Sequence, residues 1–203
     1  MSGLERIEQF KGVHAGKRLF ILASGPSLQD HDLSRLERRI VMGLNRSFLA
    51  YPDTHYHCCM DQRLFDLHED LMRRTRFLFT LEGRPWGIPM KLLGSEGFSL
   101  DLQQGVYSGY TISYLALQVA VYMGFSEVFY VGLDLAHKGG NTHFFGNDFH
   151  SRNHETTEFP KMARMLEYGA QVLTDKGIRV CNCSPTSTLD CFERVSFEYA
   201  VSL

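Results

Sequence analysis

Polar side chains that could bind a ligand or move a proton recur directly after the apolar segments of this 203-residue chain. They form five short groups: residues 24–27 (SGPS), 45–47 (NRS), 61–62 (DQ), Asp134 and residues 182–185 (NCSP). A single such residue is most often a helix cap or a turn former. Five groups in the same position exceed what loop composition explains. Together they predict a cleft lined by hydroxyl, amide and carboxyl groups.

The first group, Ser24, Gly25, Pro26 and Ser27, could turn sharply and aim backbone N–H groups at a phosphate. A plain strand-to-helix turn with Ser27 as the helix cap explains the same residues. The group matches neither GxxxxGK[ST] nor GxGxxG. A P-loop and a classical dinucleotide site are therefore not indicated.

Two small residues, Ser108 and Gly109, precede a long apolar segment and offer a second site for an anion at a helix start. A capping loop is the alternative interpretation of this pair. Asn45 and Asp61 each follow a short apolar run, where an amide or a carboxyl group can contact a ligand.

A carboxylate and a histidine stand close together further along the chain. Asp134 ends an apolar run, where it can hold a metal, a ribose hydroxyl or a neighbouring backbone group. His143 follows nine positions later in a glycine-flanked loop, and imidazole titrates near neutral pH. His143 is thus a candidate general base, with a partly packed surface histidine as the alternative. His137, His150 and His154 compete locally for the same role.

The elements that must position these groups are visible as apolar segments. Six of them predict strands: residues 18–23, 39–44, 55–60, 76–80, 127–134 and 178–181. Residues 111–123 and 159–176 predict helices, each followed by a capping glycine. This alternation predicts a single-domain α/β fold over residues 1–203, Rossmann-like, with a mostly parallel sheet flanked by helices. Residues 82–107 are rich in Gly and Pro and predict a lid or a sheet-edge insertion.

Composition narrows the class of protein. The 21 basic and 23 acidic residues nearly balance, which argues against a nucleic-acid partner. The start of the chain is not of secretory type, and we see no apolar stretch that is long and uncharged enough for a transmembrane segment. Five cysteines, an odd number without zinc-knuckle spacing, favour reduced thiols, no bound metal and a cytoplasmic location. A homo-oligomer is compatible with this sequence.

The motifs ASGPSL, LNRSF, GFSEVFYVGLDL, THFFG and CNCSPTSTLDCF occur in an order that resembles a known family. It is the MptE-like family, which includes the archaeal 6-hydroxymethylpterin pyrophosphokinase and the flagellin-modifying motility accessory factors. The order is also similar to that in bacterial lipooligosaccharide sialyltransferases. The resemblance runs from about residue 17 to residue 197.

The resemblance implies a nucleotide-binding set of residues and a catalytic histidine. The implied nucleotide contacts are Ser24, Gly25, Pro26, Ser27, Asn45, Asp61, Ser108, Gly109 and Ser187. His143 matches the catalytic histidine, and Asp134 matches the strand-end acid. Phe144 and Ala136 stand where the sialyltransferases have tyrosines around the donor phosphate, and the segment between Asp134 and His143 is shorter than in those enzymes.

Three functions follow as expectations. The leading one is a glycosyltransferase for surface glycan or glycoprotein, without a tightly bound cofactor, that uses a CMP- or other nucleotide-activated sugar. There His143 deprotonates an acceptor hydroxyl. The second is a diphosphokinase acting on a pterin-type alcohol with ATP and Mg²⁺, the metal held by Asp61 and Asp134. The third is a non-catalytic nucleotide-binding module. Metal dependence separates the first two, and binding without turnover separates the third.

Overall fold

The computed structural model describes residues 6–147 and 152–203, the side chains of residues 152–156 excepted. It is a single α/β domain built on an eight-stranded sheet in the order β10-β9-β8-β1-β2-β3-β4-β5, with every strand pair parallel. The strands are β1 (Arg18–Leu22), β2 (Val41–Leu44), β3 (Tyr56–Cys58), β4 (Phe77–Leu81), β5 (Ile88–Met90), β8 (Glu127–Val131), β9 (Arg179–Asn182) and β10 (Glu193–Arg194). The predicted fold class is confirmed.

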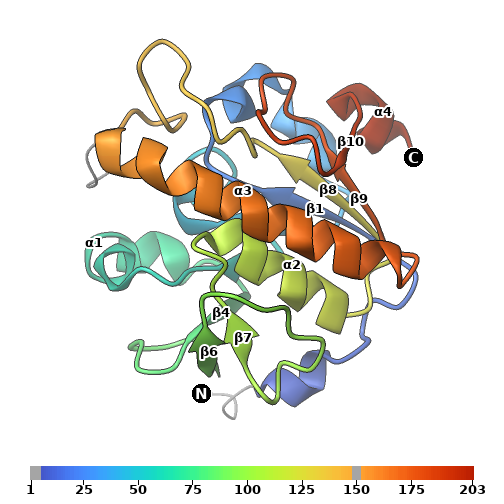
Figure 1. The fold of residues 1–203 in the computed structure, drawn as a ribbon. Helices are drawn as coiled ribbons and strands as arrows, with labels where there is room; N and C mark the ends of the chain where they lie inside the picture. The colour runs from blue at the N-terminus through green and yellow to red at the C-terminus, as the bar shows by residue number, and fades with distance from the viewer. Residues whose placement is uncertain (1–5, 148–151) are drawn as a thin grey trace.

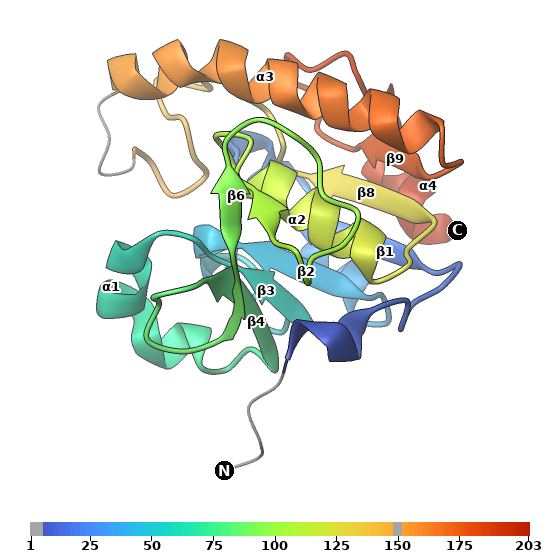
Figure 2. The same cartoon turned by 60° about the horizontal axis from the view of Figure 1, so that its bottom comes forward.

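Alternate residues of each central strand pack on opposite faces of the sheet. Leu19 and Ile21 of β1 join a core formed with helices α2 (Ile112–Tyr122) and α3 (Arg152–Thr174). Phe20 and Leu22 join a second core on the other face, with α4 (Phe197–Ser202) and the turns after β1. Helix α1 (Gln62–Met72) covers the neighbouring part of this second face. Figures 1 and 2 show α2 and α3 side by side over the sheet.

Several elements differ from the sequence prediction. The connection between β1 and β2 holds only 3-10 helices, η2 (Pro26–Asp30) and η3 (Leu33–Leu36). Ser27 therefore lies inside a short turn and does not cap an α-helix. Helix α3 begins at Arg152 and carries Pro160 in its interior, whereas we expected a start at residue 159. Helices α1 and α4 lack long apolar stretches and were not predicted. The other short helices are η1 (Ile7–Phe10) and η4 (Asn45–Leu49).

Residues 82–107 extend the fold at one edge. They supply the edge strand β5 and a separate two-stranded sheet, β6 (Leu92–Gly94) with β7 (Val106–Tyr107). Gln118 of α2 is fully buried and ties this segment to the core. Its side-chain oxygen accepts from the N–H groups of Ser99 and Tyr107, at 3.0 and 3.1 Å. Its amide donates to the carbonyls of Tyr107 and Tyr114, at 2.8 and 3.1 Å.

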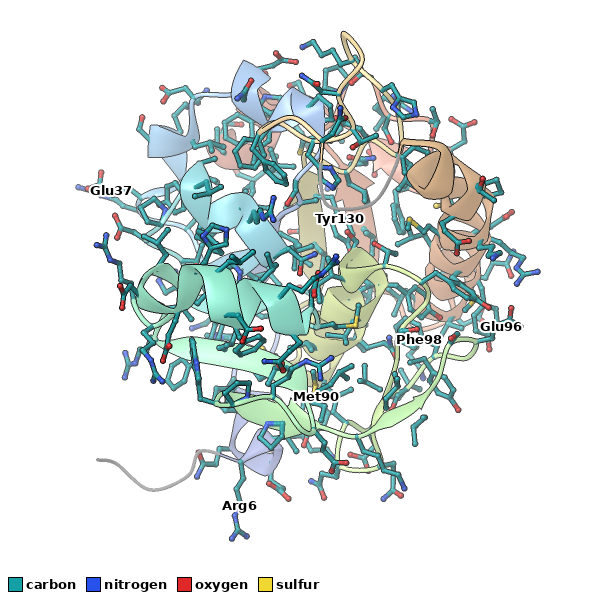
Figure 3. The ribbon with its side chains drawn as sticks, turned by 90° about the vertical axis from the view of Figure 1, so that its left-hand side faces the viewer. Arg6, Glu37, Met90, Glu96, Phe98 and Tyr130 are labelled. Atoms are coloured by element: carbon teal, nitrogen blue, oxygen red, sulfur yellow. The ribbon has the colours of Figure 1, made fainter. Side chains whose placement is uncertain are left out.

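A second buried polar side chain links the sheet to α2. Tyr130 of β8 lies in the interior, while Arg6, Glu37 and Glu96 lie at the periphery (Figure 3). Its hydroxyl donates to the carbonyl of Ser113 in the first turn of α2, at 2.7 Å. Burial raises the pKa of Tyr130, so the hydroxyl keeps its proton and the bond. The start of α2 is thereby held over the end of β8.

Among the residues that the structure describes, no helix is long and apolar enough to cross a membrane. The five cysteines are free thiols, and four of them are buried. Burial raises the pKa of Cys59 and of Cys183 to about 12, which keeps both thiols protonated at neutral pH.

Gln118→Leu is expected to lower the free energy of unfolding by about 2–4 kcal/mol. It keeps the side chain's size but leaves the N–H groups of Ser99 and Tyr107 buried without an acceptor. Urea unfolding measures the loss. Gln104→Leu, at an exposed position of the same segment, is the control and should change stability by less than about 0.5 kcal/mol. Equal effects of the two substitutions would contradict the proposed tie.

Candidate functional site

A cavity of about 350 Å³ opens at the carboxyl edge of the sheet. From β1 the chain first adds β2, β3, β4 and β5 in order on one side. It then adds β8, β9 and β10 on the other side of β1, so the strand order reverses beside β1. Ligands of open α/β sheets bind at such a reversal. The described lining residues are Ala23, Ser24, Gly25, Asn45, Arg46, Met60, Asp61, Tyr110, Thr111, Ile112, Ser113, Gly132, Leu133, Asp134, Leu135, Thr142, His143, Phe145, Glu158, Phe159 and Met162.

Asp134 fastens the loops on both sides of this reversal. One oxygen of its buried carboxyl group accepts from the backbone N–H of Ser27 at 2.7 Å, and the other accepts from the Ser27 hydroxyl at 2.6 Å. The Asp134 carbonyl accepts from the N–H of Thr188 at 2.9 Å. Asp134, the strand-end acid expected with His143 at the catalytic centre, therefore joins three loops, and its carboxyl group is engaged by the protein.

Gly25 lies directly against this junction. Its N–H donates to the carbonyl of Gly132 at 2.8 Å. A Cβ atom at Gly25 would lie 2.4 Å from that carbonyl oxygen and 2.7 Å from a carboxyl oxygen of Asp134. No side chain fits there, so the glycine is required by the close approach of the β1 and β8 loops.

The buried His57 holds the backbone of Asn45 in place through a hydrogen bond. Asn45 has a left-handed backbone, with φ of 45°, and its carbonyl pairs with Nε2 of His57 at 2.8 Å. Its side-chain oxygen is buried and has no hydrogen-bond partner in the structure. Since an orphaned amide oxygen costs free energy, Asn45 is well suited to accept a hydrogen bond from a ligand.

Burial lowers the pKa of His57 to about 4. The ring is therefore neutral at physiological pH, and its Nε2–H donates to Asn45 while Nδ1 remains an acceptor. Protonation of His57 would place a charge in the protein interior.

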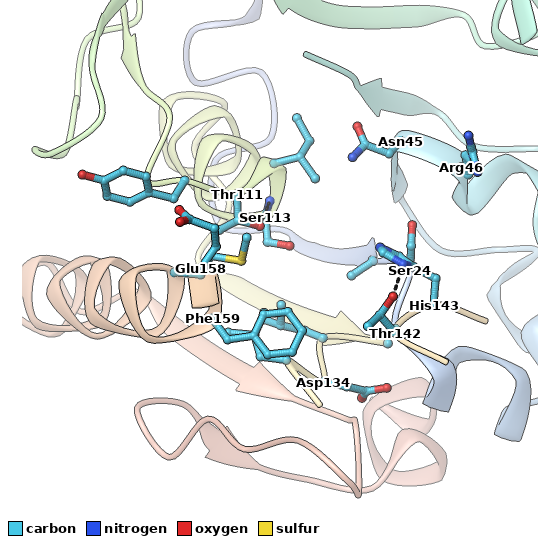
Figure 4. A pocket seen from close by; sticks show the side chains of 18 of the residues that line it. Ser24, Asn45, Arg46, Thr111, Ser113, Asp134, Thr142, His143, Glu158 and Phe159 are labelled. Carbon is cyan, nitrogen blue, oxygen red and sulfur yellow. Dashed lines mark hydrogen bonds between the residues drawn. The ribbon is translucent and has the colours of Figure 1, made fainter. Parts of the chain in front are cut away.

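His143 lies at the cavity wall in a loop that is tied to the β1 loop. The N–H of Phe144 donates to the carbonyl of Ser24 at 3.0 Å, and the amide of Gln29 donates to the carbonyl of Phe144 at 2.9 Å. Nδ1 of His143 pairs with the hydroxyl of Thr142 at 2.9 Å, drawn as a dashed line in Figure 4. The histidine ring is thus oriented before any ligand binds.

The opposite wall comes from the first turn of α2 and from the part of α3 that carries Glu158 and Phe159. Thr111 caps α2, its hydroxyl accepting from the N–H of Ser113 at 3.3 Å, and both residues line the cavity. Glu158 and Phe159 of α3 face the same space (Figure 4). The first turn of α2 thus brings its positive dipole end to the cavity.

Backbone strain is concentrated at this site. Among the described residues, the non-glycine positions with positive φ are Asn45, Tyr110 and Leu135, and all three line the cavity. Such conformations cost free energy and persist where the surrounding structure holds them. Their clustering independently marks the cavity as the functional region.

The structure brings together six of the residues named from sequence and separates five. Ser24, Gly25, Asn45, Asp61, Asp134 and His143 line the cavity. Pro26, Ser27, Ser108, Gly109 and Ser187 are absent from its lining. Of the competing histidines, His150 lies outside the described residues, as does the side chain of His154, and His137 is exposed and does not line the cavity.

The five separated residues lie at positions next to the cavity-forming loops rather than in the cavity lining. Ser27 is fully buried against Asp134, beside Pro26, the first residue of η2. Ser108 precedes the cap of α2 by three residues, and a Cβ at Gly109 would meet the ring of Tyr114 at 2.2 Å. The hydroxyl of Ser187 accepts from the amide of Asn182 at 2.9 Å.

Other lining residues were given no role from sequence, chiefly Thr111, Ser113, Thr142, Glu158 and Arg46, the last of which belonged to the strand-end group 45–47. Arg46 directly follows the strand-end Asn45 in LNRSF, and Thr142 directly precedes His143 in THFFG. Adjacency to a named residue was the available signal for both. Glu158 gave no signal, because α3 begins earlier than its apolar stripe indicates.

Each of the two strand-end acids is engaged by other groups of the protein. Asp61 caps α1, and its carboxylate binds the guanidinium of Arg63 at 2.6 Å. The carboxyl group of Asp134 is occupied by Ser27. Within residues 6–147 and 152–203, no group of three or more His, Cys, Asp or Glu side chains is arranged to hold a metal ion.

No family model matches the chain, and a search of curated proteins finds no match. Among solved structures, the fold is similar to the sialyltransferase CstII from Campylobacter jejuni in complex with cytidine-5'-monophosphate, with a TM-score of 0.53, 15% identity, and coverage of 90% of this chain and 86% of that one. For CstII with the substrate analogue CMP-3FNeuAc, the TM-score is 0.53 and the identity 14%, with 89% of this chain and 86% of that one covered. For an alpha-2,3-sialyltransferase from Campylobacter jejuni in apo form, the TM-score is 0.50 and the identity 14%, with 90% of this chain and 80% of that one covered.

These similarities show that the chain has the fold of these sialyltransferases. The resemblance to the MptE-like branch stays a prediction.

Asp134→Asn is expected to lower the free energy of unfolding by about 1–3 kcal/mol, because the amide presents an N–H group to one of the two Ser27 donors. Urea unfolding of Asp134→Asn, Ser27→Ala and the double variant should give a coupling energy above about 1 kcal/mol. Asp190→Asn, whose side chain is 98% exposed, is the matched control. A coupling near zero would contradict the junction.

Stability should fall in acid through His57. Its folded pKa of about 4 lies below the ordinary value of 6.5, so its contribution is fully present above pH 6.5 and is lost as pH falls toward 4. Between pH 7 and pH 4.5, wild-type protein should lose about 2 kcal/mol more than His57→Gln does. The difference isolates His57, because His14, His31 and His68, whose pKa values are also lowered, remain in both proteins. Parallel pH profiles would contradict the buried neutral imidazole.

Proposed function

We propose that the protein is a glycosyltransferase that takes a nucleotide-activated sugar, with a CMP-sugar as the favoured donor, and transfers the sugar to a glycan or glycoprotein hydroxyl. The single observation that carries the proposal is the position of His143 on the wall of a cavity at the strand-order reversal. The similarity in fold to sialyltransferases solved with CMP and with a CMP-sugar analogue adds support for the donor class. A cytoplasmic site of action is part of the proposal.

The cavity offers suitable groups for each part of such a donor. The buried side-chain oxygen of Asn45 can accept a hydrogen bond from a base or ribose. The first turn of α2, with Thr111 and Ser113, provides N–H and hydroxyl groups at a positive helix end, which suits a departing phosphate. The role expected for Ser108 thereby passes to residues three to five positions later in the chain.

The transfer step follows from the orientation of His143. When Nδ1–H donates to the Thr142 hydroxyl, Nε2 carries the lone pair and can accept the proton of the acceptor hydroxyl. The acceptor oxygen forms the new glycosidic bond as the bond between the sugar and the phosphate oxygen breaks. With a CMP-sugar donor the nucleoside monophosphate departs with the bonding electrons, and its negative charge develops next to the first turn of α2.

No arrangement in the described residues favours the diphosphokinase alternative, because Asp61 and Asp134 are held by Arg63 and Ser27. The non-catalytic alternative is decided by turnover. A thermal-shift panel of CMP, CDP, UDP, GDP and ATP, with and without Mg²⁺, comes first. A rise in melting temperature with CMP that does not need Mg²⁺ is the expected result. A rise with ATP that does need Mg²⁺ would favour the diphosphokinase instead.

His143→Ala should then reduce sugar transfer by a factor of about 10²–10⁴ and leave CMP affinity within about twofold of wild type. Transfer is measured as release of nucleotide from the donor that the panel and a donor screen select. His137→Ala, an exposed histidine six positions earlier, is the control and should keep wild-type turnover. An active His143→Ala enzyme would eliminate the proposed base. Nucleotide binding without turnover on any donor would leave the binding-module function.

A further inference from the structure

Three side chains stack on one wall of the cavity. The ring of Phe145 contacts both the guanidinium of Arg46, 4.9 Å from its centroid, and the imidazole of His143, whose centroid is 5.0 Å away. The His143 and Phe145 rings are inclined by only 18°. Arg46 is the second residue of η4, which follows β2, while the other two residues come from the loop after β8. Both loops follow strands adjacent to β1, so the stack bridges the reversal.

The basic Arg46 and the acidic Glu158 lie on different sides of the cavity. Arg46 is the only lysine or arginine among the described residues that line it. The lining acids are Asp61, Asp134 and Glu158. The first two are bound by Arg63 and Ser27. Figure 4 shows Glu158 on the α3 side and Arg46 with His143 on the other.

From this arrangement we propose that Arg46 is a specificity residue that binds the anionic group of the donor next to the reacting centre, either its phosphate or a carboxylate of the transferred sugar. The inference rests on the proposed function and names the chemistry that the substrate must carry. A donor with a negative group at the His143 end is selected, and a neutral nucleoside is not.

The surroundings of Arg46 suit this task. An arginine packed on an aromatic face loses little further freedom when it binds, and its planar fork can donate two parallel hydrogen bonds to a phosphate or a carboxylate. Arg46 is also only partly exposed, so the anion replaces little bulk water around the charge. Phe145 contacts both Arg46 and His143, and it therefore fixes the anion site relative to the general base.

The test compares ligands that differ by one charged group. Isothermal titration calorimetry is carried out with cytidine, CMP and CMP-3FNeuAc, the analogue bound in a CstII structure. The variants are Arg46→Gln, Arg46→Lys and Phe145→Leu. Arg38→Gln is the matched control, because it removes one positive charge from an exposed position that does not line this cavity.

For Arg46→Gln, cytidine affinity should stay within twofold of wild type while affinity for the anionic ligand falls by about tenfold or more, the loss of one charge-assisted contact. A loss already present with CMP assigns the phosphate. A loss that appears only with CMP-3FNeuAc assigns the carboxylate. Arg46→Lys should recover part of the affinity, Phe145→Leu should give an intermediate loss, and Arg38→Gln should match wild type.

Equal affinity of Arg46→Gln and wild type for all three ligands would overturn the proposal while leaving the glycosyltransferase function intact. An equal loss for cytidine would also overturn it, because the residue would then only shape the cavity. If wild-type protein binds no cytidine ligand, the CMP-sugar donor fails. The comparison is then made with the nucleotide that the panel selects and its nucleoside, and failure of wild type to bind any nucleotide overturns both proposals.

Discussion

The fastening of Ser27 by Asp134 is the interaction on which the rest of the site depends. At a reversal of strand order in an open parallel sheet, the loops that follow the two neighbouring strands diverge and leave a crevice between them. Here the buried carboxyl group of Asp134 accepts two hydrogen bonds from Ser27. The backbone carbonyl of Asp134 accepts from the N–H of Thr188 in the loop after β9. A buried carboxyl group is stable only when such donors surround it. The requirement for those donors fixes the positions of three loops at once.

The remaining parts of the site are positioned from this junction. Ser24 lies between β1 and the Asp134–Ser27 junction. Its carbonyl accepts from the N–H of Phe144 and so holds the loop that carries His143. On the other side of β1, the neutral imidazole of His57 supports the strained backbone of Asn45. Hydrogen bonds within the protein therefore hold the strained backbone of Asn45 and the loop of His143 in position. Such preorganisation is what a site for electrostatic catalysis needs.

The fold and the function are separate questions in this protein. The sheet order and the helices give the fold of sialyltransferases that were solved with CMP ligands, at 14–15% identity. One fold can support several chemistries, so the activity must be argued from the side chains in the cavity. Here those side chains are a histidine oriented by Thr142, the first turn of α2 and the cation of Arg46. Phe144 and Ala136 lack the hydroxyl group of a tyrosine, and Arg46 is the only lysine or arginine among the described residues that line the cavity.

The sequence by itself determined six of the eight strands of the main sheet, the apolar helix α2 and the polar groups at the strand ends, because these depend on local hydrophobic patterns and on the shared edge of parallel strands. It also singled out His143 and Asn45, which line the cavity. Only the tertiary structure decided that Asp134 and Ser27 bind each other, that the first turn of α2 replaces Ser108 at the cavity, and that Glu158 lies in its wall. Those outcomes depend on where a helix begins and on which loops meet across more than a hundred residues. Local pattern carries no information about either, since a polar residue after a strand can face a ligand or a neighbouring loop with equal local preference.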